Sequence, residues 1–386
     1  MRIALTITEL DPGGAERTMV QLARYLKRRS HCVEVFALGE TSGKTLGVSP
    51  ERTCLHEKLL QAEIPWHCGH AQGAVSLPRA VVWLKRKLAE FRPDLIQSML
   101  FHANVVTALA NRWLDLPHVG GARVAQPQWW RRRMQQWATN NHMEKLVCVS
   151  HSLAQDCTTR ERIRADKIVV IPNGISVPAG ESNPIHQKPQ FLLQYLPGVD
   201  TTFFIFVGRL SKQKGIDLLL RRIDQLLQPL PQHHLVILGD GPLQNQVRSL
   251  IDHSACGNRI HTVGWHPNPL DWIRHAQAVL VPSIYEGMPN VILEAMSVAR
   301  PVVALDVEGV SELLGESPQQ IAAAGNLTQF IELAIALGKN PSRGNALGQA
   351  NLDRARREHR LEDKLALYEQ LYRKILMADH GNSMLT

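Results

Sequence analysis

The sequence predicts an α/β protein of two doubly wound domains, each a parallel sheet covered by helices on both faces. Short apolar segments alternate with amphipathic segments up to residue 172, and the same alternation restarts after residue 201. Residues 172–200 contain five prolines and three glycines without periodicity, as is typical of a linker. A length of 386 residues accommodates two domains of ordinary size. We therefore expect an N-terminal domain over residues 1–172, a linker over 173–200 and a C-terminal domain over 201–360.

The first domain is predicted from apolar strands and from the helices between them. Helix Ala15–Arg29 ends in three basic residues, which suit the negative end of the helix dipole. Ser150 is placed to cap the helix that follows the strand before it. The expected strands are Arg2–Thr8, His31–Leu38, Leu95–Met99, Lys145–Val149 and Lys167–Ile171, with a further helix over Ala103–Arg112.

The second domain repeats this order. Its expected strands are Phe203–Val207, His234–Leu238, Arg259–Val263, Ala278–Pro282 and Val302–Leu305. Its expected helices are Gly215–Leu227, Leu243–His253, Pro269–His275 and Asn290–Ala299. The charged segment Asn351–Met377 has an apolar helical face, and its part over 361–377 could cover this domain or cross back onto the first. Because ligands bind at the carboxyl ends of such strands, we expect the functional site in a cleft between the domains.

Composition limits the classes of function. An apolar fraction of 44% excludes global disorder, and no apolar run reaches the length of a spanning helix. The six cysteines are scattered without a CxxC pair, which predicts reduced thiols in a cytosolic protein, and no signal peptide is expected. A net charge of +8 favours acidic partners, such as nucleotide phosphates or an anionic lipid surface.

The segment Ser283–Met296 places two carboxylates around a helix start. Glu286 lies in a loop after a strand, and Glu294 lies within a helix among apolar residues. A carboxylate there is costly to bury without hydrogen-bonding partners, and sugar hydroxyls would be suitable ones. The alternative is a solvated Glu294 and a turn acid at Glu286.

A second segment, Val207–Gly215, groups Arg209, Lys212 and Lys214 where a helix begins. Cations are disfavoured at that end of a helix unless an anion lies among them. A diphosphate would fit the fork of Arg209 and the point charge of Lys214. The alternative is a solvated basic loop.

Three further features are weaker. Gly13 and Gly14 follow the first strand and permit close approach of a ligand, or they form a plain turn. Gly241, in Gly239–Pro242, could approach a nucleobase or simply reverse the chain. His102 follows the strand Leu95–Met99, where polar groups collect, although a histidine there is commonly only a helix-start residue.

Two aromatic segments in the first domain can each be interpreted in more than one way. Trp130, Met134 and Trp137 lie at helical spacing beside Arg131, Arg132 and Arg133, which would suit a helix on an anionic membrane. The alternative is that this tryptophan face packs on the domain core with solvated arginines. The cluster Trp66–His70 lacks a further ligand for a metal site, so we expect a loop there.

Taken together, these segments resemble the retaining glycosyltransferases of family 4, the group 1 glycosyl transferases. Their GT-B fold has two facing Rossmann-like domains with a cleft between them. The resemblance spans nearly the whole chain and rests on Gly13–Glu16, Ile171–Ile175, Gly208–Leu210 with Lys214-Gly215, Gly239–Pro242 and the Glu286/Glu294 pair.

The resemblance implies a hexosyltransferase-type enzyme that uses a nucleotide-sugar donor, with no metal and no other cofactor. Glu286 would face the donor sugar, and His102 would approach that sugar from the N-terminal side. Glu294 would bind the ribose, while Arg209 and Lys214 would neutralise the leaving diphosphate. The remaining expected donor contacts come from backbone at Gly13, Gly14, Gly241, Gly287, Met288, Pro289 and Asn290.

The leading hypothesis is transfer of a sugar to a glycan or lipid-linked acceptor in bacterial polysaccharide or glycolipid biosynthesis. The enzyme would be cytoplasmic, and it could be peripheral on the inner face of the membrane. The alternatives are a GT-B sugar-nucleotide epimerase and a non-catalytic sugar-nucleotide-binding subunit. No nucleic-acid partner is expected, because the usual binding signatures are missing from the sequence.

Overall fold

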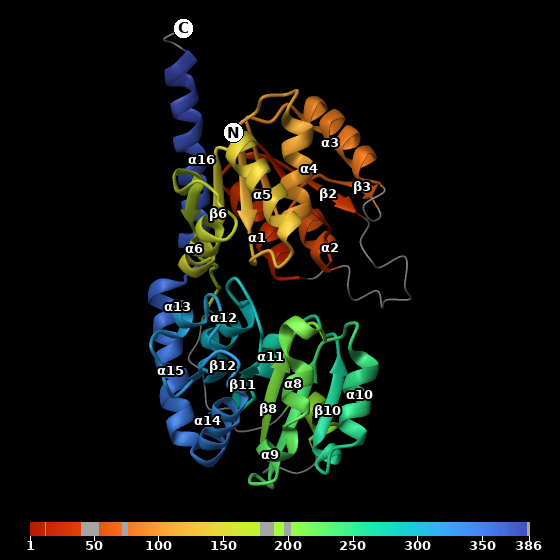
Figure 1. Ribbon diagram of the computed structural model, residues 1–386, viewed down its shortest axis with the longest axis vertical. Coiled ribbons are helices and arrows are strands. Elements are labelled where there is room, and N and C mark those ends of the chain that lie inside the picture. The colour runs from red at the N-terminus through yellow and green to blue at the C-terminus, as the bar shows by residue number, and fades with distance from the viewer. Residues whose placement is uncertain (12, 40–53, 72–75, 178–188, 197–201, 384–386) are drawn as a thin grey trace. The chain divides into compact units, whose positions relative to one another are not determined.

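The computed structural model describes residues 1–383 except residues 12, 40–53, 72–75, 178–188 and 197–201 (Figure 1). The chain forms two compact units. The N-terminal unit comprises Met1–Asn173 together with Glu362–Thr386, and the C-terminal unit comprises Gly174–Leu361. Each unit is an α/β sandwich with a parallel sheet in the middle.

Within the described residues, the N-terminal sheet has seven parallel strands in the order β3-β2-β1-β4-β5-β6-β7. Strand β1 is central and pairs with β2 on one side and β4 on the other. The strand order reverses between β1 and β4, and such reversal points are where ligands bind in open sheets. The strands are β1 (Arg2–Ile7), β2 (Cys32–Gly39), β3 (Trp66–Ala71), β4 (Leu95–Met99), β5 (His118–Ala122), β6 (Lys145–Cys148) and β7 (Ile168–Val170).

Helices cover both faces of this sheet, because each helix has an apolar side that it buries against the sheet. Helix α1 (Gly14–Arg28) buries Met19, Leu22 and Leu26, and the Ser150 hydroxyl caps α6 by accepting from the Leu153 amide. The other helices are α2 (Cys54–Gln61), α3 (Leu77–Phe91), α4 (Phe101–Asn111), α5 (Trp129–His142) and α6 (His151–Thr159).

The C-terminal sheet has six parallel strands among the described residues, in the order β10-β9-β8-β11-β12-β13. Its order reverses between β8 and β11. The strands are β8 (Thr202–Val207), β9 (His233–Leu238), β10 (Ile260–Gly264), β11 (Ala278–Val281), β12 (Val302–Leu305) and β13 (Ile321–Ala322). The helices are α7 (Gln190–Leu193), α8 (Ile216–Leu220), α9 (Ile223–Leu227), α10 (Gln244–Asp252), α11 (Pro269–Ile273), α12 (Asn290–Ser297), α13 (Val310–Leu314), α14 (Leu327–Lys339) and α15 (Pro341–Glu358).

Three local predictions are wrong. The predicted loop Trp66–His70 is the edge strand β3, where His67 pairs with Glu34 at 2.8 Å. The predicted helix Gly215–Leu227 is divided into α8 and α9 at Arg222, which leaves helical geometry with φ −121°.

The predicted helix Asn351–Met377 is also two helices, α15 and α16 (Leu361–Ser383). The backbone of Ile175 forms a bridge there: its N–H donates to the His359 carbonyl and its carbonyl accepts from the Leu361 N–H. The helix therefore breaks at His359-Arg360 without a glycine or a proline.

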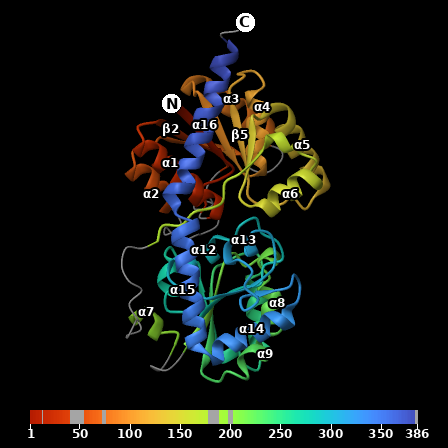
Figure 2. The ribbon, with the colours of Figure 1, turned by 90° about the vertical axis from the view of Figure 1, so that its left-hand side faces the viewer.

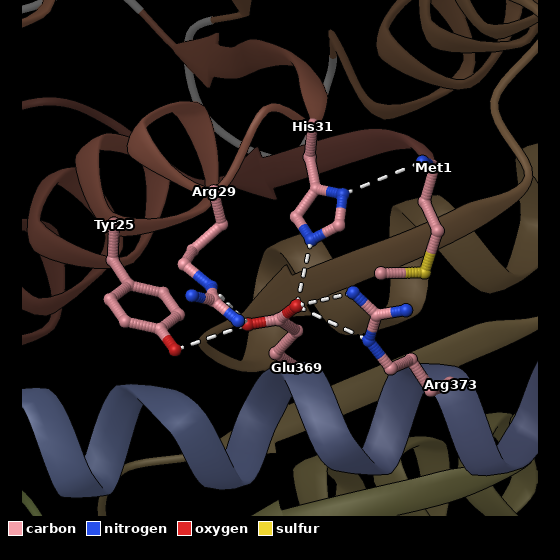
Figure 3. A network of polar contacts seen from close by, with 6 residues as sticks. All are labelled: Met1, Tyr25, Arg29, His31, Glu369 and Arg373. Atoms are coloured by element: carbon pink, nitrogen blue, oxygen red, sulfur yellow. Dashed lines mark hydrogen bonds and ion pairs between the residues drawn. The ribbon is translucent and has the colours of Figure 1, made fainter.

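Helix α16 belongs to the N-terminal unit and lies beside α1 (Figure 2). Its Glu369 carboxylate is buried and accepts hydrogen bonds from the Tyr25 hydroxyl at 3.1 Å and the His31 ring at 3.1 Å (Figure 3). The guanidinium groups of Arg29 and Arg373 complete the group. Burial opposes ionisation, but the hydrogen bonds from Arg373, His31 and Tyr25 lower the pKa of Glu369 to about 2. The ionised Glu369 side chain therefore holds α16 against α1 and the residues that follow α1.

Candidate active site

The candidate active site of the C-terminal unit is built from loops at one edge of its sheet. Strands β8 and β11 are neighbours and parallel, so the loops that follow them, over residues 208–215 and 282–289, leave the same edge. The loop after β9 adjoins on one side, and the loop after β12 on the other. All four loops lie at carboxyl ends of strands, the edge at which doubly wound sheets bind ligands.

Lys214 and Glu286 meet at this edge. The Lys214 ammonium donates to Glu286 Oε1 at 2.6 Å, and the Ser283 hydroxyl donates to the same oxygen at 2.8 Å. The Glu286 side chain is 8% exposed and that of Lys214 is 26% exposed. A buried carboxylate is costly without such partners. The two residues that the sequence placed in separate motifs therefore form one ionic pair.

One backbone hydrogen bond and one side-chain hydrogen bond connect the two loops next to this pair. The Ile284 N–H donates to the Gln213 carbonyl at 2.8 Å, and the Gln213 side-chain amide donates to the Tyr285 carbonyl at 3.1 Å. From the other side, Glu308 accepts from the Glu286 N–H at 3.2 Å. Glu286 is thus held through its side chain and through its backbone.

Two glycines allow the loops to approach this closely. Gly215 has φ +66°, and a side chain there would overlap the Pro282 carbonyl. Gly241 has φ +156°, and a side chain there would overlap the backbone of Leu210. Leu210 donates its N–H to the Asp240 carbonyl at 2.8 Å. Gly241 therefore has a structural reason of its own to be glycine, besides the donor contact predicted for it.

The remaining predicted donor residues follow Glu286 in the chain. Gly287, Met288 and Pro289 are buried in the turn before α12, and Asn290 is the first residue of that helix. Glu294 is half-buried, whereas the four apolar residues around it are fully buried. Glu294 is therefore more accessible than its apolar neighbours in α12.

Arg209 is exposed at the start of the loop after β8. Within the part of the chain that the structure describes, its side chain has no ion-pair or hydrogen-bond partner. An exposed cation of this loop, five positions before Lys214 in the sequence, is suited to bind an anion.

The predicted residues of the N-terminal unit lie at the carboxyl ends of β1 and β4. Gly13 precedes α1, and its N–H donates to the Asp11 carbonyl at 2.7 Å; Gly14 is the first helical residue. Glu16 folds back over Gly13 and is 7% exposed. Burial, together with the nearby Glu9 and Asp11, raises the pKa of Glu16 to about 7.

His102 lies in the first turn of α4, exposed, with its ring against the edge of Phe101. Partial burial and the positive charge of Arg131 lower its pKa. A neutral imidazole is able to accept or donate a hydrogen bond at neutral pH.

Helix α5 buries the face that carries its tryptophans only in part. Trp130 is 41% exposed, Met134 and Trp137 are half-buried, and the buried residues of the helix are Gln135, Ala138 and Thr139. The alternative that the tryptophan face packs on the core therefore holds only in part. Arg133 is exposed, whereas Arg132 donates to the Gln126 and Pro127 carbonyls of its own unit. No helix among the described residues is both long and apolar enough to cross a membrane.

Sequence reasoning missed three residues that shape this site. Gln213 and Ser283 stand within the two motifs, but no pattern distinguishes them from their polar neighbours. Glu308 lies in the loop after β12, and only the strand order brings that loop to Glu286.

Comparisons with known proteins identify the family. A sequence profile described as Glycosyltransferase Family 4 matches residues 12–177, and one described as Glycosyl transferases group 1 matches residues 201–340. An uncharacterized glycosyltransferase of Methanocaldococcus jannaschii is 35% identical over 116 residues, 30% of this chain and 29% of that relative. The lipopolysaccharide core biosynthesis mannosyltransferase LpsB of Rhizobium meliloti is 31% identical over 178 residues, 43% of this chain and 51% of LpsB. The chain thus spans about a third to a half of the length of these curated relatives.

The fold has a counterpart in a solved structure. HepE of Anabaena, crystallised with UDP and glucose, matches with a TM-score of 0.81 and 19% identity over 96% of this chain and 99% of HepE. This likeness confirms the predicted GT-B fold of two Rossmann-like domains. The two profile matches and the fold together show that the chain belongs to the group 1 glycosyltransferases.

Proposed function

We propose that the protein is a retaining glycosyltransferase that moves a hexose from a nucleotide-sugar donor to a glycan or lipid-linked acceptor. The observation that carries the proposal is the contact between Lys214 and Glu286 at the reversal point of the C-terminal sheet. It joins a cation suited to a diphosphate with a carboxylate suited to sugar hydroxyls. The structures of HepE with UDP and with UDP-glucose support this class of donor.

In the proposed complex, the donor diphosphate binds Lys214 and Arg209, and the positive N-terminal end of α12 helps to hold it. Glu294 accepts hydrogen bonds from the ribose hydroxyls. Glu286 faces the donor sugar, together with the backbone of Gly287–Asn290. Gly241 borders the nucleobase, and Gly13, Gly14 and His102 contact the sugar and phosphate from the N-terminal unit.

Negative charge grows on the diphosphate as the glycosidic bond breaks. Lys214 and Arg209 stabilise that charge, and a group that does so only in the transition state raises kcat. These fixed cations support a reaction without metal, and the sequence has no DxD triplet. For retention, the acceptor oxygen attacks from the face that the diphosphate leaves, and a phosphate oxygen takes the acceptor proton.

The acceptor is proposed from the relatives. LpsB acts in lipopolysaccharide core biosynthesis, and a relative in Bacillus subtilis is named as a putative teichuronic acid biosynthesis glycosyltransferase. These names support a bacterial polysaccharide or glycolipid as the acceptor. We place the enzyme at the cytoplasmic face of a membrane, with Trp130 and Arg133, the exposed members of the group Trp130–Arg133, toward an anionic surface.

The test is turnover of a panel of UDP-, GDP- and ADP-hexoses by the full chain and by the variants Lys214→Ala and Glu294→Ala. We expect one nucleotide to be preferred, and we expect both variants to lose about a hundredfold or more of the release of nucleoside diphosphate. Lys339→Ala, an exposed lysine on α14, is the matched control. Near-normal turnover in both site variants would refute the assignment of the site.

A further inference from the structure

The Arg131 side chain is held against two aromatic rings of the N-terminal unit. Helices α4 and α5 pack side by side in the N-terminal unit (Figure 1). The Arg131 guanidinium lies over the ring of Phe101, from α4, with its carbon 5.2 Å from the ring centroid. It also lies over the ring of Trp130, at 5.3 Å. Two aromatic faces therefore fix the position of this cation.

No acidic side chain within the described residues compensates the charge of Arg131. Among the residues that the structure describes, Arg131 forms no ion pair and no side-chain hydrogen bond, and its Nε is buried without a partner. The first turn of α5 contains no acidic residue, so the positive end of the helix adds to the charge of the arginine. Arg132, by contrast, is satisfied by two backbone carbonyls.

The position of Arg131 connects it with the proposed reaction. Phe101 and His102 begin α4 directly after β4, at the ligand-binding edge of the N-terminal sheet. The charge of Arg131 acts on His102, the residue proposed to contact the sugar. A guanidinium that is preorganised, has no ionic partner among the described residues and acts on the neighbouring His102 is suited to bind an oxyanion bidentately.

We propose that Arg131 binds a phosphate group of the acceptor, so that the acceptor is a phosphorylated lipid or a phosphorylated sugar. Naming this group as part of the acceptor rests on the proposed function. The oxyanion site itself does not depend on that function. The exposed faces of Trp129 and Trp130 lie next to the arginine in sequence and give an apolar or sugar portion of the acceptor a surface to contact.

The test is calorimetric titration of the full chain with octyl phosphate below its micelle concentration, in the Lys214→Ala background so that the donor phosphate site is weakened. We expect Arg131→Gln to weaken the binding about tenfold or more. We expect Arg112→Gln to change nothing, since Arg112 is an exposed arginine at the other end of α4. Arg131→Met keeps apolar packing between the two rings and decides the matter if Arg131→Gln does not fold.

Further arms identify the source of the phosphate. Inorganic phosphate should bind at least tenfold more weakly than octyl phosphate, because the organic portion of the acceptor contributes to binding. The affinity for octyl glucoside, which has no phosphate, should be the same with and without the Arg131 side chain. Equal binding by the wild-type residue and both Arg131 variants, or an equal loss in Arg112→Gln, would overturn the proposal. Loss of binding to phosphatidylglycerol vesicles alone would also overturn it, and would assign Arg131 to a membrane surface. The proposed function is tested separately by the rate of UDP-glucose hydrolysis in Lys214→Ala compared with wild type, which should fall whether or not Arg131 binds phosphate.

Discussion

Lys214 and Glu286 stand 72 positions apart in the sequence, and their side chains meet at 2.6 Å. The contact joins the loops after two neighbouring strands, β8 and β11. Each residue restricts the other: the ammonium compensates a carboxylate that is 8% exposed, and the carboxylate fixes the ammonium. Such mutual positioning before the substrate arrives is what electrostatic stabilisation of a leaving group needs.

The carboxylate of Glu286 should act on the sugar and not on the nucleotide. We expect Glu286→Gln to lower turnover of the nucleotide-sugar by about a hundredfold or more, because a neutral amide accepts sugar hydroxyls less strongly. The affinity for the nucleoside diphosphate should change less than threefold. Kinetics and calorimetry measure the two effects, with Glu332→Gln, an exposed residue of α14, as the control. Equal losses in turnover and nucleotide affinity would contradict this role.

Gln213 should position the ionic pair without touching the substrate. Its side chain and carbonyl make two of the hydrogen bonds between the loops. Gln213→Ala removes the side-chain bond, so we expect a loss of about tenfold in kcat with little change in KM, and a destabilisation of about 1 kcal/mol. Gln213→Glu lacks the donor and should not restore kcat. The variant Gln225→Ala, at an exposed residue of α9, is the control. An unchanged kcat in Gln213→Ala would contradict a positioning role for Gln213.

Glu369 should make the stability of the N-terminal unit depend on acid. Its pKa is about 2 in the folded state, against an ordinary value of 4.5. The stabilisation is therefore complete above about pH 5 and is lost as the pH falls from about 4.5 toward 2. At pH 7 we expect Glu369→Gln to cost about 3 kcal/mol of unfolding free energy, and at pH 3 about 1 kcal/mol.

Urea unfolding at the two pH values measures this difference. Glu362 lies on the same helix as Glu369 and forms an exposed ion pair with Arg28 of α1. The control Glu362→Gln removes this pair and should lower the free energy of unfolding by less than about 1 kcal/mol. A cost for Glu369→Gln that does not change between pH 7 and pH 3 would mean that packing, and not charge, explains the effect.

Glu16 should have the opposite dependence on pH. Its folded pKa is raised to about 7, so between about pH 4.5 and 7 the folded state holds a proton that the unfolded state has released. Stability then falls as the pH rises through this range, by up to about 3 kcal/mol. Glu16→Gln should flatten the decline in Tm between pH 5 and 8, and Glu63→Gln, on an exposed turn, should not. A parallel decline in wild type and Glu16→Gln would show that Glu16 ionises normally.

The proposed membrane surface predicts a specific loss of binding. Trp130 and Arg133 are the exposed members of the α5 group, so the double variant Trp130→Ser, Arg133→Ser should lower partitioning to phosphatidylglycerol vesicles about fivefold. The dependence on salt should weaken with it. Co-sedimentation measures both, and Arg112→Ser with Trp113→Ser is the matched control because Trp113 is equally an exposed tryptophan beside an arginine. Equal effects of the two double variants would argue against a membrane contact by α5.

Much of the fold could be predicted because its strands are buried and continuous in apolar character. The strands β8, β9 and β11 are of this kind, and the predicted motifs at Arg209–Lys214, Gly241 and Glu286 follow them. Strand β3 could not be predicted, since its half-buried sequence WHCGHA shows neither apolar continuity nor alternation. The break between α15 and α16 depends on a distant backbone, that of Ile175, which no local pattern contains.

The candidate site was predictable to the same extent. Local chemistry marked Arg209, Lys214 and Glu286 as charged residues that follow strand ends, and it marked Glu294 as a carboxylate among apolar helical residues. The contacts of Gln213 and Glu308 depend on which strands are neighbours. The same is true of Arg131, whose stacking on Phe101 requires α4 and α5 to pack together.

The central claim, that the edge formed by Lys214 and Glu286 holds the diphosphate of a donor, is tested most directly by nucleotide binding. The measurement compares the calorimetric affinities of UDP, GDP and ADP with those of their nucleosides, in wild type and in Lys214→Ala. We predict that one diphosphate binds wild type at least tenfold more tightly than its nucleoside, and that Lys214→Ala removes most of this preference while leaving nucleoside affinity unchanged. A preference for the diphosphate that survives in full in Lys214→Ala would contradict the account.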